Sequence, residues 1–232
     1  MAWREQDEPA VTQSDAAYAL LHAEILDGRL APGAKIKISE VSTTLGFSPG
    51  AVREALSRLA AERMTVATAQ KGHCVAGVSR EELKDLTRTR VTIEQICLRS
   101  AIERGDIEWE AAIVAAYHRL HRIRPVAPDD QARMTGEWTR AHATFHAALA
   151  AACGSPWMLA LREMLYAQSE RYRRLSLALS QGARAVDAEH KALLDACLSR
   201  QGDLASCLIE EHLTRTADII LNAPQLSRAG SE

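Results

Sequence analysis

The chain has 232 residues, of which 47% are hydrophobic and only 4% are aromatic. This length provides one large or two small domains with cores of their own, and the predominance of alanine and leucine favours helices over strands. The formal net charge of −2 excludes a global basic field, so any binding of nucleic acid requires a local patch.

Three further patterns concern the location of the protein. No apolar run approaches the roughly 18 residues that a membrane span needs, and the polar, acidic N-terminus lacks the pattern of a signal peptide. The five cysteines are odd in number and form no C-x-x-C motif, which is typical of buried thiols rather than of a disulfide framework. We therefore expect a cytoplasmic protein with no membrane partner.

The first part of the chain is predicted to be a tail over residues 1–13 and a winged helix-turn-helix over residues 14–78. In chain order we expect a helix capped at Ser14 and stopped at Gly28, an extended piece at 35–38, a helix over 40–45 capped by Ser39, a helix over 49–61 capped by Ser48, and strands at 65–68 and 73–76. The two short helices form the helix-turn-helix, and the hairpin forms the wing.

The start of the helix over 49–61 is small and exposed, so it can approach the major groove of DNA closely. Ser48 and Gly50 lie at this end, and Arg53 can read a guanine edge with two hydrogen bonds. Arg58, Lys71 and the Ser48 hydroxyl can meet phosphates. Structural alternatives exist, because Arg53 can pair with a surface carboxylate and Ser48 can cap the helix without touching DNA. Together with the wing, the set favours DNA binding.

Three stretches of this part, residues 25–33, residues 48–59 and the wing glycine Gly72, resemble the GntR family of bacterial transcription regulators. The resemblance implies that DNA is contacted by Arg53, Arg58 and a wing tip in the minor groove made of Lys71, Gly72 and His73. One departure is Pro49, which stands where many members carry an arginine. A base contact typical of the family is therefore missing, so the operator sequence of other members cannot be assumed for this protein.

Residues 79–222 are predicted to form an all-α bundle, followed by a tail over 223–232. Six helices are expected, over 79–103, 107–123, 135–153, 157–179, 186–200 and from 202 onward, with a polar linker at 127–130. Helical periodicity turns four histidines inward, namely His142 and His146 on one helix and His190 and His212 on two others. His118 and His121 lie in an arginine-rich run and are expected at the surface.

Four inward histidines on three helices have two explanations. Each can be a hydrogen-bonded core residue, or together they can hold a metal ion, because bundles build metal sites from facing helices. The spacing of His142 and His146 is that of H-E-x-x-H zinc proteases, but Ala143 replaces the general base and argues against hydrolysis. Zinc is our first expectation for this site, with nickel, copper, manganese or iron as alternatives.

The segments Phe145-His146, Glu189-His190 and Glu211-His212-Leu213 resemble the FCD effector domain of the FadR branch, in its six-helix, VanR-like form. The resemblance implies metal ligation by these histidines, with His142 standing where family members commonly have an aspartate. It also implies that Arg90 pairs with a carboxylate effector, with Arg171 as a further candidate. For Arg90 the alternative is an ordinary salt bridge with Glu94, four residues on.

Together these patterns predict a mainly α protein: a homodimeric, ligand-responsive bacterial transcription factor, most often a repressor in this family, and not an enzyme. Its partners would be a near-palindromic, double-stranded DNA operator and a small carboxylate. One alternative is a metal-dependent enzyme built on the four histidines. Another is an architectural DNA-binding protein whose histidines only pack, which would bind neither metal nor effector.

Overall fold

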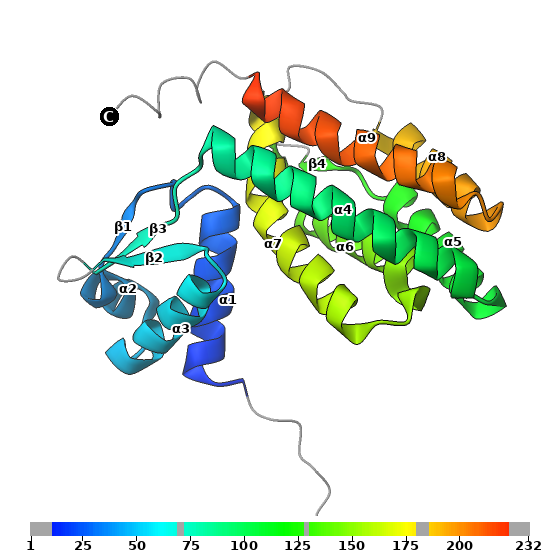
Figure 1. Ribbon diagram of the computed structural model, residues 1–232. Helices are drawn as coiled ribbons and strands as arrows, with labels where there is room; N and C mark the ends of the chain where they lie inside the picture. Colours follow the sequence, from blue (N-terminus) through cyan, green and yellow to red (C-terminus); the bar gives the residue numbers. More distant parts are fainter. Residues whose placement is uncertain (1–10, 69–71, 128–129, 180–185, 223–232) are drawn as a thin grey trace, which may run out of the picture. The chain divides into compact units, whose positions relative to one another are not determined.

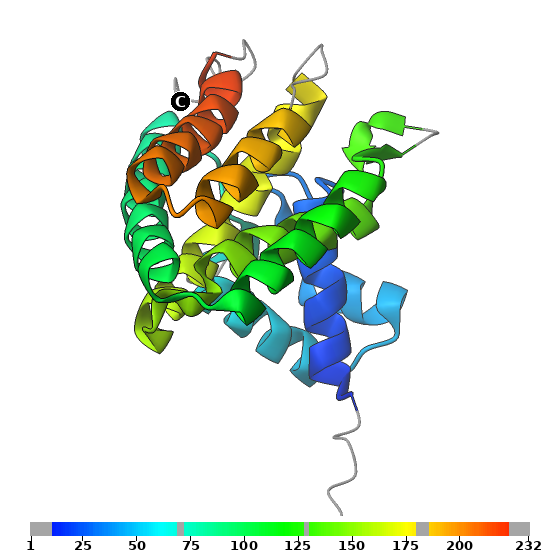
Figure 2. The ribbon, with the colours of Figure 1, turned by 90° about the vertical axis from the view of Figure 1, so that its right-hand side faces the viewer.

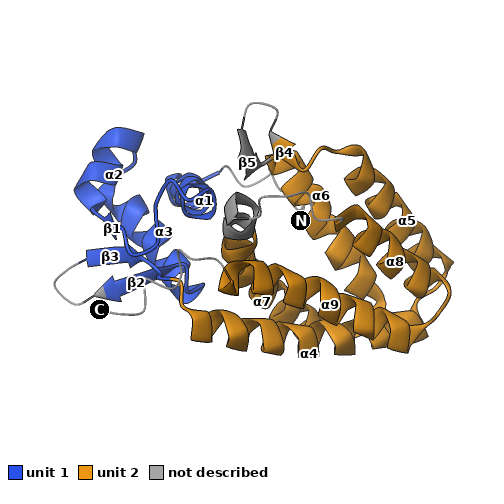
Figure 3. Ribbon diagram, turned by 90° about the horizontal axis from the view of Figure 1, so that it is seen from above, with its two compact units in different colours: residues 1–77 blue, residues 78–232 orange. Residues whose placement is uncertain are grey.

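The computed structural model describes residues 11–68, 72–127, 130–179 and 186–222. The chain divides into two compact units, residues 1–77 and residues 78–232 (Figure 1, Figure 3). Helices dominate both units, which confirms the mainly α fold class expected from the sequence. Within the described ranges, none of the helices is long and apolar enough to cross a membrane.

The first unit is a winged helix-turn-helix. Its elements are α1 (Gln13–Leu26), β1 (Lys35–Ile36), α2 (Ile38–Leu45), α3 (Pro49–Ala61), β2 (Thr65–Thr68) and β3 (Gly72–Val75). The strands pair antiparallel in the order β1-β3-β2. Helices α1 and α3 pack against each other, and Leu21, Leu56 and Met64 are fully buried in the core between these elements.

Two helices of this unit begin earlier than the sequence pattern predicts. The cap of α1 is Thr12 and not Ser14, because the Thr12 hydroxyl accepts the backbone N–H of Asp15 and the Asp15 carboxylate accepts that of Thr12. This reciprocal capping box satisfies two N–H groups at once, which a lone serine cap cannot do. Helix α2 already begins at Ile38, so Ser39 lies inside the helix and does not cap it.

The second unit is a helical bundle with one short hairpin. Its elements are α4 (Arg80–Arg104), α5 (Ile107–Arg122), β4 (Val126–Ala127), β5 (Asp130–Met134), α6 (Gly136–Ala150), a 3-10 turn (Ala151–Cys153), α7 (Pro156–Leu179), α8 (Val186–Leu198) and α9 (Gly202–Leu221). The described residues thus contain the six α-helices predicted for this part. Helix α9 (red) runs alongside α4 (teal to green) in both Figure 1 and Figure 2, and α7 contacts both.

The ends of the predicted polar linker at 127–130 belong to strands, because Ala127 ends β4 and Asp130 begins β5, whereas residues 128–129 lie outside the described residues. Strands β4 and β5 pair antiparallel, with Val126 opposite Met134. The Thr135 backbone N–H donates to the Pro125 carbonyl at 3.1 Å and closes the base of the hairpin. A hairpin closed by backbone hydrogen bonds can form in a sequence that lacks the alternating apolar and polar residues of a strand.

Helix α6 carries its histidines into the interior because they share its apolar stripe. Trp138, Phe145 and Leu149 of this stripe are buried, and they join a core cluster with side chains of α4, α5, α8 and α9. His142 and His146 lie four residues apart on the same face. The packing of the stripe therefore places both imidazoles away from water.

The cysteines follow the expectation of buried thiols only in part. Cys97, Cys153 and Cys197 are buried, and burial raises the pKa of the Cys197 thiol to about 12. Cys207, however, is exposed and Cys74 is half-buried. The helical period explains Cys207, since the preceding Ser206 of α9 points inward and the next residue turns toward solvent.

We expect Gly105→Ala to lower the free energy of unfolding by about 1–3 kcal/mol. A Cβ at Gly105, which ends α4, would lie 2.1 Å from Cε3 of Trp109 and 2.8 Å from the carbonyl oxygen of Ala101. The indole cannot easily move, because it is buried and its N–H donates to the Ala148 carbonyl at 3.0 Å. Urea unfolding measures the loss. In the matched control Gly202→Ala the new Cβ would meet nothing within 4 Å, and equal midpoints for the two variants would contradict the steric argument.

Candidate metal centre and nucleic-acid interface

Four buried histidines meet in the interior of the second unit. They are His142 and His146 of α6, His190 of α8 and His212 of α9. None is more than 5% exposed, and one ring nitrogen of each lies within 4.8 Å of those of the other three. The structure therefore brings the predicted set together, whereas His118 and His121 lie exposed on α5.

Two of the imidazoles are oriented by hydrogen bonds through Nδ1. Nδ1 of His212 lies 2.8 Å from Oε2 of Glu189, whose other carboxylate oxygen pairs with Arg215 at 3.1 Å. Nδ1 of His142 lies 2.9 Å from the hydroxyl oxygen of Tyr166. When Nδ1–H donates in this way, Nε2 keeps its lone pair and is the nitrogen available to a metal ion.

Burial favours the neutral form of two histidines of the cluster. It lowers the pKa of His142 and His146 well below the ordinary value for histidine, and the neighbouring imidazoles lower it further because like charges would repel. Neutral imidazole is the form that binds metal ions. Neither ring nitrogen of His146 has a hydrogen-bond partner among the described residues. A core histidine in that state is unsatisfied, so the site fits a metal ion better than simple packing.

The surroundings of the cluster also suit a metal ion. The Trp138 ring stacks on His142 at 4.8 Å between centroids, and the Phe145 ring lies 5.3 Å from His190 and 5.6 Å from His146. These aromatic side chains are buried and cover part of the imidazole surface. Four nitrogen donors in an apolar shell match the preferences of zinc, nickel, copper or iron rather than those of magnesium or calcium.

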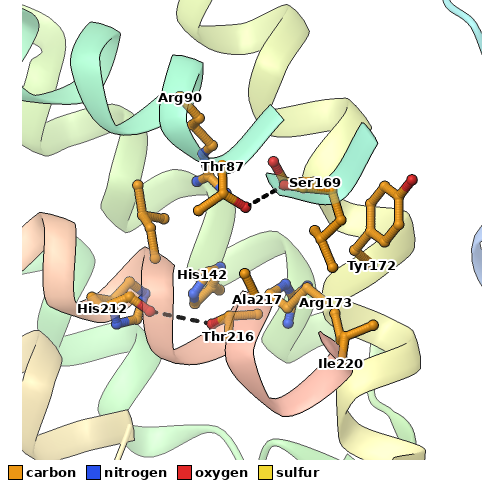
Figure 4. A pocket seen from close by; sticks show the side chains of 12 residues that line it. Thr87, Arg90, His142, Ser169, Tyr172, Arg173, His212, Thr216, Ala217 and Ile220 are labelled. Carbon is orange, nitrogen blue, oxygen red and sulfur yellow. Dashed lines mark hydrogen bonds between the residues drawn. The ribbon is translucent and has the colours of Figure 1, made fainter. Parts of the chain in front are cut away.

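A cavity lies beside the cluster, and His142 and His212 reach its wall (Figure 4). Its empty volume is about 430 Å³, part of which is open to solvent. The other polar lining residues are Thr87, Arg90, Ser169, Tyr172, Arg173 and Thr216, and the aliphatic ones are Leu83, Leu213, Ala217 and Ile220. A concave site with both polar and apolar walls has the character of a small-molecule site.

Arg90 reaches this cavity from α4 although it is only 6% exposed. Its Nη2 lies 3.4 Å from Oε1 of Glu94, so the expected salt bridge exists but is long. The guanidinium also stacks over the Tyr166 ring at 4.8 Å. Its Nε is buried without a hydrogen-bond partner in the described part of the chain. The geometry therefore leaves Arg90 with donor capacity for an anion in the cavity.

Arg171, the further candidate for the effector, lies outside the lining of this cavity. It is buried, and its guanidinium lies 5.8 Å from the centroid of the Tyr172 ring. Arg173 lines the cavity instead, paired with Glu170 at 2.5 Å and packed over the Trp138 ring at 5.1 Å. The sequence contained a signal for this residue, because positions 162, 166, 169 and 173 follow one face of a helix.

In the first unit, three of the predicted DNA contacts lie at the exposed start of α3. Ser48, Gly50 and Arg53 are all exposed. Ser48 caps the helix as expected, its hydroxyl accepting the Ala51 N–H at 3.2 Å. Pro49 occupies the first helical position, which needs no hydrogen-bond donor. This end of the helix is therefore well defined and open to a ligand.

Arg58 is engaged within the first unit, which the sequence reasoning did not foresee. Its guanidinium pairs with Asp15 at 2.7 Å and packs over the Tyr18 ring at 4.2 Å. A phosphate contact by Arg58 would have to compete with that carboxylate. In the wing, Gly72 has a φ of +84°, a conformation that favours glycine, and His73 is half-buried. Lys71 lies outside the described residues.

Comparisons with known proteins identify the two units. Residues 13–75 match the family model of bacterial regulatory proteins of the gntR family, and residues 85–215 match the FCD domain. The uncharacterized HTH-type transcriptional regulator BphR of Paraburkholderia xenovorans is 36% identical over 206 residues, or 89% of this chain and 84% of that protein. The HTH-type transcriptional repressor GlaR of Escherichia coli is 36% identical over 211 residues, or 89% of this chain and 94% of that protein.

Solved structures agree at the level of the fold. Escherichia coli McbR/YncC matches with a TM-score of 0.72 at 19% identity, over 91% of this chain and 98% of that one. A putative GntR regulator from Rhodococcus matches with a TM-score of 0.71 at 20% identity, with the same two coverages. The sequence relatives are named as regulators and not as enzymes. The chain therefore belongs to the GntR family of transcriptional regulators, with an FCD domain following its winged helix-turn-helix.

Proposed function

We propose that this regulator is a cytoplasmic, ligand-responsive repressor whose second unit binds a divalent metal ion and a small carboxylate. The observation that carries the proposal is the buried histidine cluster beside a cavity lined by Arg90. Repression rather than activation is supported by the Escherichia coli relative GlaR, which is named a transcriptional repressor. Sequence-specific DNA binding would be the task of the first unit.

In this proposal the four histidines of the cluster hold the metal ion. Zinc is the first choice for a set of neutral imidazoles, with nickel, manganese or iron as alternatives. When bound, the ion supplies a positive, Lewis-acidic centre for a carboxylate oxygen. The Glu189 carboxylate then fixes the tautomer of His212 through the hydrogen bond from Nδ1.

The cavity would take a small organic acid. Arg90 provides a guanidinium whose charge is only partly compensated by the long pair to Glu94, and a carboxylate can accept two of its N–H groups. The aliphatic wall, which includes Leu83 and Ile220, would cover a hydrocarbon portion of the acid. A positive wall on one side and an apolar wall on the other disfavour cations and strongly polar neutral molecules.

Regulation would follow from two copies acting together. A homodimer with its winged helices related by a two-fold axis would bind a near-palindromic operator. A carboxylate that binds one arrangement of this dimer more tightly shifts the population toward it. The free energy of operator binding then changes by at most the difference between the free energies with which the carboxylate binds the two arrangements.

The proposal is tested by measuring operator affinity in the presence of small acids. In vitro selection from random DNA first supplies the operator, and fluorescence anisotropy then reports its affinity for zinc-loaded protein. We expect at least one member of a panel of aliphatic mono- and dicarboxylates to weaken binding, and the same acid to act less on chelator-treated protein. If no acid changes the affinity while metal is bound, the effector part of the proposal fails.

We predict that Arg53→Ala loses about 1–3 kcal/mol of discrimination between operator and random DNA. Arg53 is exposed near the start of α3, where a side chain can reach base edges. Lys71→Ala should weaken both complexes evenly, and Arg29→Ala, which removes a side chain paired with Glu24 and Asp27, should change neither. Competition titrations at one fixed salt concentration measure these differences. If Arg53→Ala lost the same affinity for the operator and for random DNA, Arg53 would not read base edges.

A further inference from the structure

Tyr166 touches both halves of the proposed ligand site. Its hydroxyl oxygen lies 2.9 Å from Nδ1 of His142, and its ring lies under the guanidinium of Arg90, with Cζ 4.8 Å from the ring centroid. The guanidinium of Arg162 approaches the same ring at 5.7 Å. The side chain is buried on α7. Its polar end therefore meets a histidine of the cluster, and its face meets the arginine of the cavity.

We propose that Tyr166 is a positioning residue that holds His142 in the orientation and tautomer needed to bind a metal ion. The inference rests on the proposed function, because it assigns a role within the same site. An imidazole that coordinates through Nε2 carries its proton on Nδ1, and a buried Nδ1–H requires an acceptor. The phenol oxygen lies 2.9 Å from Nδ1 and can accept that hydrogen bond.

The surroundings explain why a neutral phenol suits this position. At His212 the same task is done by the Glu189 carboxylate. A carboxylate in place of the Tyr166 hydroxyl would add a second counterion for the nearby guanidinium groups. The uncharged phenol accepts the N–H of His142 and does not neutralise Arg90. The charge of Arg90 is then shared between Glu94 and an anionic ligand.

The test uses Tyr166→Phe, which removes the hydroxyl and keeps the ring under Arg90. We expect the affinity for Zn²⁺, measured in the full-length protein by competition with a chromophoric chelator, to fall about 10–100-fold. Co²⁺ provides a second readout, because its visible absorption depends on the geometry of its ligands. We expect the Co²⁺ bands of Tyr166→Phe to shift relative to those of the wild type.

Tyr172→Phe is the matched control. Tyr172 is another buried tyrosine of α7 and lines the cavity, but its hydroxyl donates to Oε2 of Glu82 at 2.8 Å and not to a histidine, so it controls for the metal readouts. We expect this variant to keep the wild-type Zn²⁺ affinity and Co²⁺ spectrum. Urea unfolding of the metal-free proteins separates folding from metal binding, since both variants lose one buried hydroxyl and should be destabilised by similar amounts.

Two outcomes would overturn the inference in different ways. If Tyr166→Phe binds Zn²⁺ as tightly as the wild type and gives the same Co²⁺ spectrum, the tyrosine does not position His142, while the metal site stands. If the wild type itself binds neither ion, the proposed metal site fails, and the role of Tyr166 fails with it. The wild-type titration therefore distinguishes the two failures.

Discussion

His146→Ala is expected to lose the metal ion. We expect the wild type, purified without a histidine tag or chelator, to carry about one equivalent per chain, and the variant to carry almost none. His146 is 1% exposed, and both of its ring nitrogens are buried without hydrogen-bond partners in the described residues. Alanine has no side-chain atom that can bind the ion. The backbone carbonyl oxygens of the helix cannot replace the lost ligand, because they already accept helical hydrogen bonds. Plasma mass spectrometry measures the metal content.

A histidine outside the cluster provides the control for this variant. His121 lies on α5 with a side chain that is 52% exposed and paired with Asp187, so His121→Ala should bind metal as the wild type does. Zinc at 100 times its dissociation constant should stabilise the wild type by about 2.7 kcal/mol and His146→Ala far less. If the wild type takes up no metal after reloading with zinc, nickel or manganese, the histidines only pack, and the effector search begins from Arg90 alone.

The helices could be predicted because their signals are local, whereas the exact starts and the hairpin could not. Thr12 and Ser14 are both good caps, and the choice between them depends on a reciprocal bond with Asp15 that periodicity does not encode. The β4-β5 hairpin lacks an alternating apolar pattern and is closed by backbone bonds. Backbone pairing of this kind leaves little trace in side-chain composition.

The histidine cluster could also be predicted, because inward periodicity on three helices is visible in the sequence. The charged network around it could not. Arg90 and Glu94 are spaced like a solvent-exposed helix pair, and only the contact with Arg162, 68 residues farther along the chain, shows that the pair is buried. Helical spacing puts Tyr166 on the same face of α7 as Arg173, but its role could not be predicted, because the contact with His142 depends on how α6 and α7 pack.

Glu94→Ala is expected to lower the free energy of unfolding by about 3–5 kcal/mol. Glu94 is 3% exposed, and its two oxygens accept from two arginines, Oε2 from Nε of Arg162 at 2.8 Å and Oε1 from Nη2 of Arg90 at 3.4 Å. Both arginines are themselves buried. Removing the carboxylate leaves two guanidinium charges away from water without the anion that they share, and this cost greatly exceeds that of a lost surface pair.

Asp85→Ala on the same helix is the control, because Asp85 pairs with Arg88 where both side chains are more than half exposed, and its loss should cost at most about 1 kcal/mol. Urea unfolding followed by circular dichroism compares the two.

Acetate in place of chloride should recover part of the loss in Glu94→Ala and act less on the wild type, because a free carboxylate can take the place of the missing one beside Arg90. Equal losses for Glu94→Ala and Asp85→Ala would mean that the buried arginines have other counterions. Arg90 would then have no unmet charge with which to attract an anionic effector.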